Sequence, residues 1–288
     1  MENSLISWCH DTANLWIGCM KVHEGCDNCY AEALDKRWNG NHWGGSTNRK
    51  MVNSIWDNLK RFQKLAEQSG EIRRVFVGSM MDIFEKPYPV EDSKGNLIPG
   101  ITTGDIRDRF FSEVVPNSPN LQFLLLTKRP GNILKYIPSK WIETPPQNVI
   151  YGTSAVNQQT ADDMIGKLLE VPGRHFISAE PLLGPISFRW AKWHDYNGRT
   201  GVKDQYDGLK GIDWIIVGGE SGQKSRPMQP DWARGIRDQC IEAGVPFHFK
   251  QWGQFEPDGN DNMHRVQKKD HYALLDGIEY KNFPIEVL

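Results

Sequence analysis

The stretch Trp214-Ile-Ile-Val-Gly-Gly-Glu-Ser-Gly222 contains the pattern that decides the fold of this 288-residue chain. A short apolar run ends in two glycines and then in a charged residue. Continuous apolar runs of this length are typical of strands that are buried on both faces of a parallel sheet. The turn directly after such a strand is where α/β proteins place the residues that bind ligands.

Five more runs follow the same pattern, and longer helix-compatible segments lie between them. The expected strands are 74–77, 122–126, 148–152, 175–178, 214–217 and 246–249. The expected helices are 29–38, 49–67, 105–114, 130–136, 161–169 and 230–243. This alternation predicts repeated βα units around a parallel sheet. With one strand in or before the segment 19–29, we expect an α/β fold: a partial (β/α) barrel of about six or seven parallel strands.

The organisation expected from this pattern is one large domain followed by a tail. Residues 1–253 form the partial barrel, and residues 254–288 form a C-terminal extension. Two segments without clear periodicity, 91–104 and 189–211, are predicted to be loops, the second of them an insertion.

Each predicted strand ends in polar residues, which parallel strands would bring to one edge of the sheet. These residues are Ser79 and Asp82, Lys128 and Arg129, Ser154, Ser178 and Glu180, Gly218 to Glu220, and Lys250 and Gln251. Glycine and serine are also ordinary turn residues, so each position alone has a purely structural explanation. Six such ends together favour a binding site.

The composition limits the partners of the protein. With 34 basic and 36 acidic side chains, only a local patch could attract nucleic acid. The segment from Arg49-Lys50 to Lys64 is one such patch, although it equally fits a solvated helix face. No apolar run is long enough for a membrane span, and five cysteines do not suggest a disulfide framework. We therefore expect a cytoplasmic protein without a membrane partner.

Three of those cysteines, Cys19, Cys26 and Cys29, lie close together near the N-terminus. One interpretation is an iron–sulfur cluster whose fourth iron is open to S-adenosylmethionine. A second is a structural zinc site completed by Cys9, His10 or His23. A third is ordinary structural cysteine. Gly18 and Gly25 directly precede two of the cysteines, and glycine allows the backbone to wrap closely around a cluster.

Several motifs, in a fixed order from about Trp8 to Gly253, resemble one family. They are Trp16-x-Gly-Cys19-x-Lys-Val-x-x-Gly-Cys26-x-x-Cys29-Tyr-Ala-Glu32, Phe76-Val-x-Ser79-x-x-Asp82-x-Phe84, Leu125-Leu-Thr-Lys-Arg-Pro130, Glu180-Pro-Leu-Leu-Gly-Pro185, Val217-Gly-Gly-Glu-Ser-Gly222 and Lys250-Gln-Trp-Gly253. The chain resembles the phage-associated three-cysteine-motif family, which is itself similar to radical S-adenosylmethionine enzymes. The first two cysteines are farther apart here than in the usual radical-enzyme motif.

The resemblance implies a 4Fe-4S cluster held by Cys19, Cys26 and Cys29, with S-adenosylmethionine as the second cofactor. The implied reaction is reductive cleavage of S-adenosylmethionine and removal of a hydrogen from a substrate, for which a nucleobase of phage DNA is one candidate. The implied partners are an electron donor of the flavodoxin or ferredoxin type and a nucleic acid or nucleotide substrate, in the cytoplasm of a bacterium or phage-infected host. The alternative is a zinc-stabilised nucleic-acid-binding phage protein without catalysis.

The resemblance also assigns individual roles. The cofactor-binding residues would be Tyr30, Ser79 and Asp82, Ser154, Ser178 and Glu180, and Gly218, Gly219 and Glu220. Asp82 and Ser79 would receive the amino group of the methionine part, and Ser178 or Glu180 would meet the ribose. Gly218, Gly219 and Glu220 would admit the adenine. The candidate catalytic residues would be Lys128, Arg129, Lys250 and Gln251.

Overall fold

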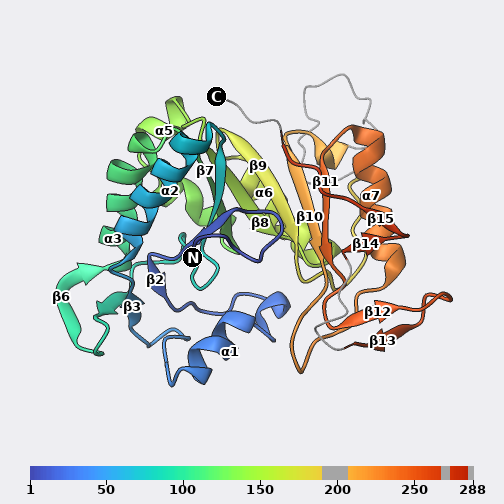
Figure 1. Cartoon of the computed structure of the whole chain (residues 1–288), viewed down its shortest axis with the longest axis horizontal. Coiled ribbons are helices and arrows are strands. Elements are labelled where there is room, and N and C mark those ends of the chain that lie inside the picture. Colours follow the sequence, from blue (N-terminus) through green and yellow to red (C-terminus); the bar gives the residue numbers. More distant parts are fainter. Residues whose placement is uncertain (190–206, 267–272, 285–288) are drawn as a thin grey trace. The chain divides into compact units, whose positions relative to one another are not determined.

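The protein is described by a computed structural model covering residues 1–189, 207–266 and 273–284. These residues form two compact units (Figure 1). Of the described residues, unit 1 contains Met1–Tyr151 and Val171–Gly173, and unit 2 contains Gly152–Glu170 and those after Gly173.

A seven-stranded parallel sheet contains all the strands that the sequence predicts. Its strands are β1 (Asp11–Ala13), β4 (Arg73–Val77), β7 (Leu121–Thr127), β8 (Val149–Ser154), β9 (Arg174–Ala179), β10 (Trp214–Gly218) and β11 (Phe247–Gln251). They are hydrogen-bonded in the order β1-β4-β7-β8-β9-β10-β11. Neighbours such as β1 and β4, β4 and β7, and β9 and β10 run parallel. The predicted α/β class is confirmed, and among the described residues β1 and β11 do not pair to close a barrel.

Helices cover the parallel sheet, and this is why its strands are apolar. All five residues of β10 are buried, as are six of the seven residues of β7. In unit 1, α2 (Ile55–Ser69) contacts β1, β4 and β7 through Leu59, Phe62 and its other buried residues. In unit 2, α7 (Pro230–Ala243) contacts β11 (Figure 1). Burial on both faces explains the continuous apolar runs in the sequence.

Four of the remaining helices overlap their predicted ranges: α1 (Tyr30–Arg37), α3 (Thr103–Arg109), α4 (Ile133–Tyr136) and α6 (Gln158–Leu169). The short helix α5 (Lys140–Glu143) was not predicted. Single turns of other types are the 3₁₀ turns η1 (Glu24–Cys26), η3 (Val115–Asn117), η4 (Pro130–Asn132) and η5 (Asp207–Leu209), and the π-helical turn η2 (Phe110–Val114). The predicted helix 105–114 is therefore an α-helix continued by a π-helical turn.

Two predictions for unit 1 were wrong. Arg49–Met51 forms strand β3 instead of the start of a helix, and the expected loop 91–104 contains a hairpin of β5 (Pro89–Glu91) and β6 (Leu97–Thr102). Together with β2 (Trp16–Ile17), these strands form a second sheet in the order β2-β3-β5-β6. Asp92 closes the hairpin because its carboxylate accepts hydrogen bonds from the backbone N–H groups of Lys94 and Asn96, at 2.8 and 2.9 Å.

The C-terminal segment forms two small hairpins, β12 (Phe255–Pro257) with β13 (Met263–Arg265) and β14 (Leu274–Leu275) with β15 (Ile278–Glu279). It packs on the core of unit 2, because Trp252 Nε1 donates to the Leu274 carbonyl at 2.9 Å and Leu275 is fully buried. Of the predicted insertion 189–211, residues 190–206 lie outside the described residues.

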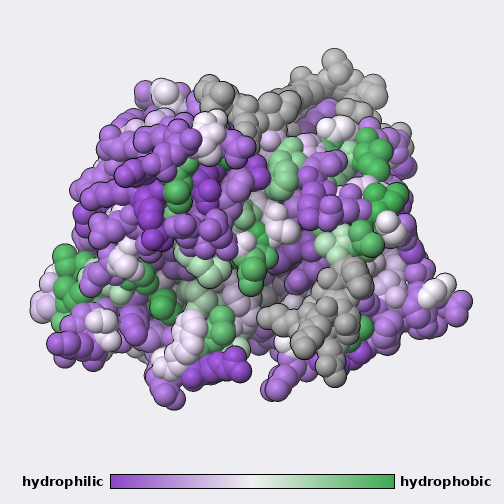
Figure 2. All heavy atoms as spheres, in the orientation of Figure 1, coloured by the Kyte–Doolittle hydropathy of each residue, from purple (hydrophilic) through white to green (hydrophobic). Residues whose placement is uncertain are grey.

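The face drawn in Figure 2 is mainly hydrophilic. Hydrophobic residues form small, separate groups between hydrophilic ones on this face. Within the described part of the chain, no helix combines the length and apolar character needed to cross a membrane.

Candidate functional site

The predicted site residues divide between the two units. Unit 1 contains Cys19, Cys26, Cys29, Tyr30, Ser79, Asp82, Lys128 and Arg129, and unit 2 contains Ser154, Ser178, Glu180, Gly218, Gly219, Glu220, Lys250 and Gln251.

The three cysteines of unit 1 lie on one loop between two short elements. Cys19 follows β2, Cys26 ends η1, and Cys29 directly precedes α1. All three are free and partly exposed. Among the described residues, no three His, Cys, Asp or Glu side chains converge on a point where one metal ion could bind. A 4Fe-4S cluster does not require such convergence, because each cysteine binds a different iron.

Arg129 connects the first cysteine to the polar end of β4. Its Nη1 lies 3.8 Å from Cys19 Sγ and donates to Asp82 Oδ2 at 2.6 Å, and its Nη2 donates to the Met20 carbonyl. Burial raises the pKa of Cys19 to about 12, and the nearby Asp82 carboxylate acts in the same direction, against Arg129. Cys19 is thus a neutral thiol until a metal displaces its proton.

Asp82 is already fully occupied by the protein. Its Oδ1 accepts from Thr127 Oγ1 at 2.7 Å and from Phe84 N–H at 3.0 Å, and its Oδ2 accepts from Lys128 N–H at 3.2 Å as well as from Arg129. The residue is 5% exposed. In this structure Asp82 therefore holds Arg129 against the cysteine loop, instead of offering a free carboxylate to an amino group.

Ser79 and Tyr30 are also close to each other. The Tyr30 hydroxyl donates to the Ser79 carbonyl at 2.7 Å, which joins the start of α1 to the segment after β4. The Ser79 hydroxyl accepts a hydrogen bond from Asn14 Nδ2 at 2.8 Å. Asn14 has no role in the sequence prediction, although its position directly after β1 matches the rule of polar strand ends.

His23 carries an unsatisfied polar atom inside the cysteine loop. Its Nδ1 accepts from Gly25 N–H at 3.1 Å, whereas its Nε2 is buried without a hydrogen-bond partner. Burial, together with the charges of Lys128 and Arg129, lowers the pKa of His23 to about 4, so the ring is neutral and Nε2 carries its proton. A buried N–H without an acceptor is unfavourable. An additional acceptor at this loop would satisfy it.

A buried ion pair that the sequence did not reveal supports the loop. Arg49 and Glu85 have side chains that are 0% and 1% exposed, and they form two hydrogen bonds of 2.8 and 3.1 Å. Arg49 Nη1 also donates to the carbonyls of His42 and Gly44 at 2.9 and 3.1 Å. Because Arg49 is buried, the prediction that it belongs to a phosphate-binding patch was wrong.

Position 18 requires glycine because the residues of this network leave no space for a side chain there. Its φ is +120°, and a Cβ atom there would lie 2.4 Å from the His42 carbonyl oxygen and 2.7 Å from Arg49 Cδ. The close approach is thus to the protein's own chain, whereas the sequence suggested close approach to a cluster.

In unit 2, Glu180 pairs with Lys250 behind Gly218. Lys250 Nζ donates to Glu180 Oε2, while Glu180 Oε1 is buried without a partner. A Cβ on Gly218 would lie 3.3 Å from Glu180 Cγ. Glu180 and Lys250 thus form an ion pair that the sequence analysis did not predict, with one carboxylate oxygen left for a further donor.

The other predicted residues of unit 2 have structural contacts. A Cβ on Gly219 would lie 1.8 Å from the Trp252 carbonyl oxygen, so the chain itself fills the space expected for adenine. Glu220 is paired with Arg226 at 2.7 Å, and Gln251 donates to Ser221 Oγ at 3.0 Å. Ser154 and Ser178 are 0% and 1% exposed.

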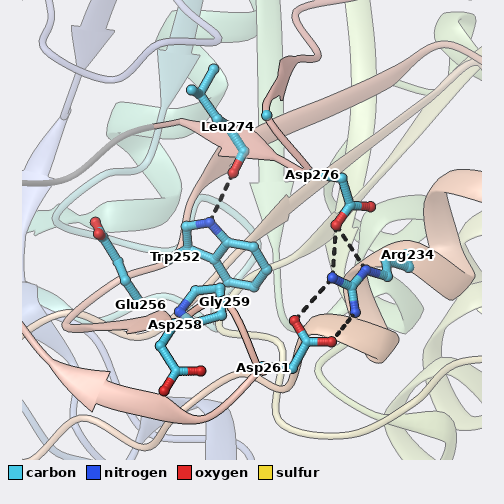
Figure 3. Close-up of a pocket in the computed structure, with 10 residues that line it drawn as sticks. Arg234, Trp252, Glu256, Asp258, Gly259, Asp261, Leu274 and Asp276 are labelled. Carbon is cyan, nitrogen blue, oxygen red and sulfur yellow. Dashed lines mark hydrogen bonds and ion pairs between the residues drawn. The ribbon is translucent and has the colours of Figure 1, made fainter.

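A separate pocket of about 310 Å³ in unit 2 contains an ion-pair cluster and none of the predicted residues. Figure 3 shows Arg234 between two carboxylates, Asp261 at 2.6 Å and Asp276 at 2.7 Å. These bonds connect α7 to both C-terminal hairpins. The cluster therefore joins elements of unit 2.

Acid is expected to weaken this cluster. Hydrogen bonds from Arg234 hold the pKa values of Asp261 and Asp276 below their ordinary range. A carboxylate with a lowered pKa stabilises the folded state at pH values above its pKa in the unfolded chain, about 4. This stabilisation is lost as the pH falls through the lower pKa of the folded state. We expect Asp276→Asn to flatten the fall in melting temperature below about pH 4. A fall as steep as in the wild type would exclude this contribution.

The residues of the cysteine loop are chemically compatible with an iron–sulfur cluster. The loop carries three free thiols and a neutral imidazole with an unsatisfied N–H, and the guanidinium of Arg129, from the segment after β7, lies beside Cys19 Sγ. Thiolates are the ligands of such clusters, and N–H groups commonly donate to their sulfurs.

Comparison with known proteins places the chain in a family. Over residues 3–284 it matches the family described as "Protein of unknown function (DUF5131)". No curated protein and no solved structure matches the chain. Because the match covers nearly the whole sequence, the protein belongs to the DUF5131 family.

Proposed function

We propose that the protein is a radical S-adenosylmethionine enzyme with a 4Fe-4S cluster on the loop of Cys19, Cys26 and Cys29. The observation that supports this most is the set of three free thiols on one loop, beside the Arg129 guanidinium. When bound and reduced, the cluster supplies the electron that cleaves S-adenosylmethionine to methionine and a 5′-deoxyadenosyl radical, which takes a hydrogen from the substrate.

The residues of unit 1 have defined tasks in this proposal. Cys19, Cys26 and Cys29 bind three irons, and Arg129 offsets the negative charge that the Cys19 thiolate acquires. Asp82 holds Arg129 in place through the 2.6 Å bond. In unit 2, the roles of Lys250 and Glu180 remain predictions, as do an electron donor of the flavodoxin or ferredoxin type and a nucleobase substrate.

Production of 5′-deoxyadenosine tests the proposal. The anaerobically reconstituted protein is incubated with S-adenosylmethionine and dithionite, and the nucleoside is quantified by mass spectrometry. We expect 5′-deoxyadenosine to form only when protein and reductant are both present. Iron-loaded protein that forms none would refute the proposed activity.

His23→Ala separates the cluster from a zinc site that is completed by His23. In the zinc alternative, His23 is one of the candidate fourth ligands, so its removal would release metal. In the proposed site His23 only donates a hydrogen bond, so the variant should keep about four irons per chain. We expect its reduction potential to fall, because a donor to the cluster is lost. Loss of metal from this variant would instead make His23 a ligand.

A further inference from the structure

A pocket of about 510 Å³ in unit 1 has no role in the proposed reaction. One wall is the end of α3 with η2, and the other is the end of α4 with the residues after it. Its polar side chains are those of Arg107, Asp108, Arg109, Ser112, Lys135 and Tyr136. Three of these are basic and one is acidic, so the pocket favours an anion.

Arg107 is the buried part of this pocket. Its side chain is 3% exposed, and its guanidinium lies 3.9 Å from the centre of the Tyr136 ring. Nη1 donates to the carbonyls of Ile83 and Glu85 at 3.3 and 3.1 Å. Nε is buried and has no hydrogen-bond partner. The position of this guanidinium is thus fixed, while part of its hydrogen-bonding capacity is unused.

The positive charge of Arg107 is poorly compensated by the protein. Asp108 Oδ1 lies 3.8 Å from Arg107 Nε, and the Asp108 side chain is 71% exposed. The nearby Glu85 carboxylate is bound to Arg49. Burial lowers the pKa of Arg107, which reflects the cost of keeping a charge there. An anion in the pocket would offset this cost.

Two exposed cationic side chains, Arg109 and Lys135, line the opening of this pocket. Arg109 lies 4.2 Å from the centre of the Trp56 ring and pairs with Glu113 at 2.9 Å. Lys135 lies beside Tyr136, with its Nζ 5.2 Å from the ring centre. Among the described residues, Lys135 has no acidic partner within ion-pair distance. One buried and two exposed cations therefore face a common space.

We propose that this pocket binds a phosphate group of a nucleotide or of a nucleic-acid strand. The planar fork of Arg107 suits phosphate oxygens, and Lys135 and Arg109 add charge at the opening. Arg49 is buried and therefore unavailable to a phosphate, whereas Arg109 and Lys135 of this pocket are exposed. The proposal goes beyond the enzymatic one and does not depend on a bound cluster.

The pocket also adjoins the segment that carries Asp82. The carbonyls bound by Arg107 belong to Ile83 and Glu85, directly after Asp82 in the chain. Asp82 in turn holds Arg129 beside Cys19. A phosphate bound to Arg107 would therefore contact a side chain that is hydrogen-bonded to the segment directly after Asp82.

Fluorescence anisotropy with a labelled single-stranded oligonucleotide tests the proposal in full-length protein, with and without iron. The double variant Arg109→Gln/Lys135→Gln changes only exposed side chains and should fold normally. We expect the double variant to weaken binding about tenfold or more. The slope of log Kd against log salt concentration should also become shallower, by the contribution of about two phosphate contacts. Lys64→Gln, an exposed change on α2, is the matched control and should change binding less than about twofold.

Adenosine 5′-monophosphate and inorganic phosphate, added as competitors, distinguish the sources of the phosphate. Displacement of the oligonucleotide by the mononucleotide indicates a nucleotide site. Variant-sensitive binding that neither competitor displaces indicates a strand. Three results would overturn the proposal: no binding of any probe, equal binding by the double variant, or an equal loss in Lys64→Gln. Arg107→Lys, if folded, should also weaken binding because lysine lacks the planar fork.

Discussion

Replacing Cys26 with alanine is expected to abolish stable cluster binding, with iron falling from about four per chain to less than about one. The loop provides three thiolates, and loss of one leaves two irons without protein ligands. The variant should also lose reductive formation of 5′-deoxyadenosine. Iron content, measured after anaerobic reconstitution, is the direct readout.

Two other cysteines provide matched controls for Cys26→Ala. Cys240 is fully buried on α7 in unit 2, and Cys9 is 7% exposed with its Sγ 3.8 Å from the Ile6 carbonyl. Cys240→Ala and Cys9→Ala should keep their iron, because neither residue is assigned to the cluster. If Cys26→Ala kept full iron and activity, the role of the loop would be disproved. Loss of metal in Cys9→Ala would indicate the zinc alternative.

Arg49→Met is expected to lower the free energy of unfolding by about 3–5 kcal/mol. The substitution leaves the Glu85 carboxylate buried without its partner, in a site where its side chain is 1% exposed. Burial already raises the pKa of Glu85, while the hydrogen bonds from Arg49 oppose that shift. Chemical denaturation followed by tryptophan fluorescence measures the loss.

A double-mutant cycle separates pairing from packing. Arg49→Met/Glu85→Met removes both charges and should be more stable than Arg49→Met alone, since no unpaired charge remains. Arg61→Met is a suitable control, because its pair with Glu2 is exposed and should contribute less than about 1 kcal/mol. A cost for Arg49→Met as small as that of Arg61→Met would contradict a supporting role.

The sequence predicted the elements whose signals are local. The helix α7 has its predicted bounds because Pro230 lies in its first turn and Gly244 adopts a left-handed φ of +70° after its end. The parallel strands were found because β10 and its neighbours are buried on both faces. Cys19 and the other cysteines could be singled out by spacing alone.

Features that depend on distant partners could not be predicted. Arg49 looked like a surface charge on a helix, but its partner Glu85 is 36 positions away and only the fold brings them together. Likewise, the sequence showed Asp82 as a free strand-end carboxylate, whereas Thr127 and Arg129 occupy it. In unit 2, Gly219 is required by the Trp252 carbonyl, a contact that exists only after folding.

The most direct test of the central claim is metal analysis of the anaerobically purified wild-type protein together with its absorption spectrum. The account predicts brown protein with about four irons and matching sulfide per chain, and broad absorption at about 400 nm that bleaches with dithionite. Colourless protein that contains one zinc and no iron after reconstitution would contradict it.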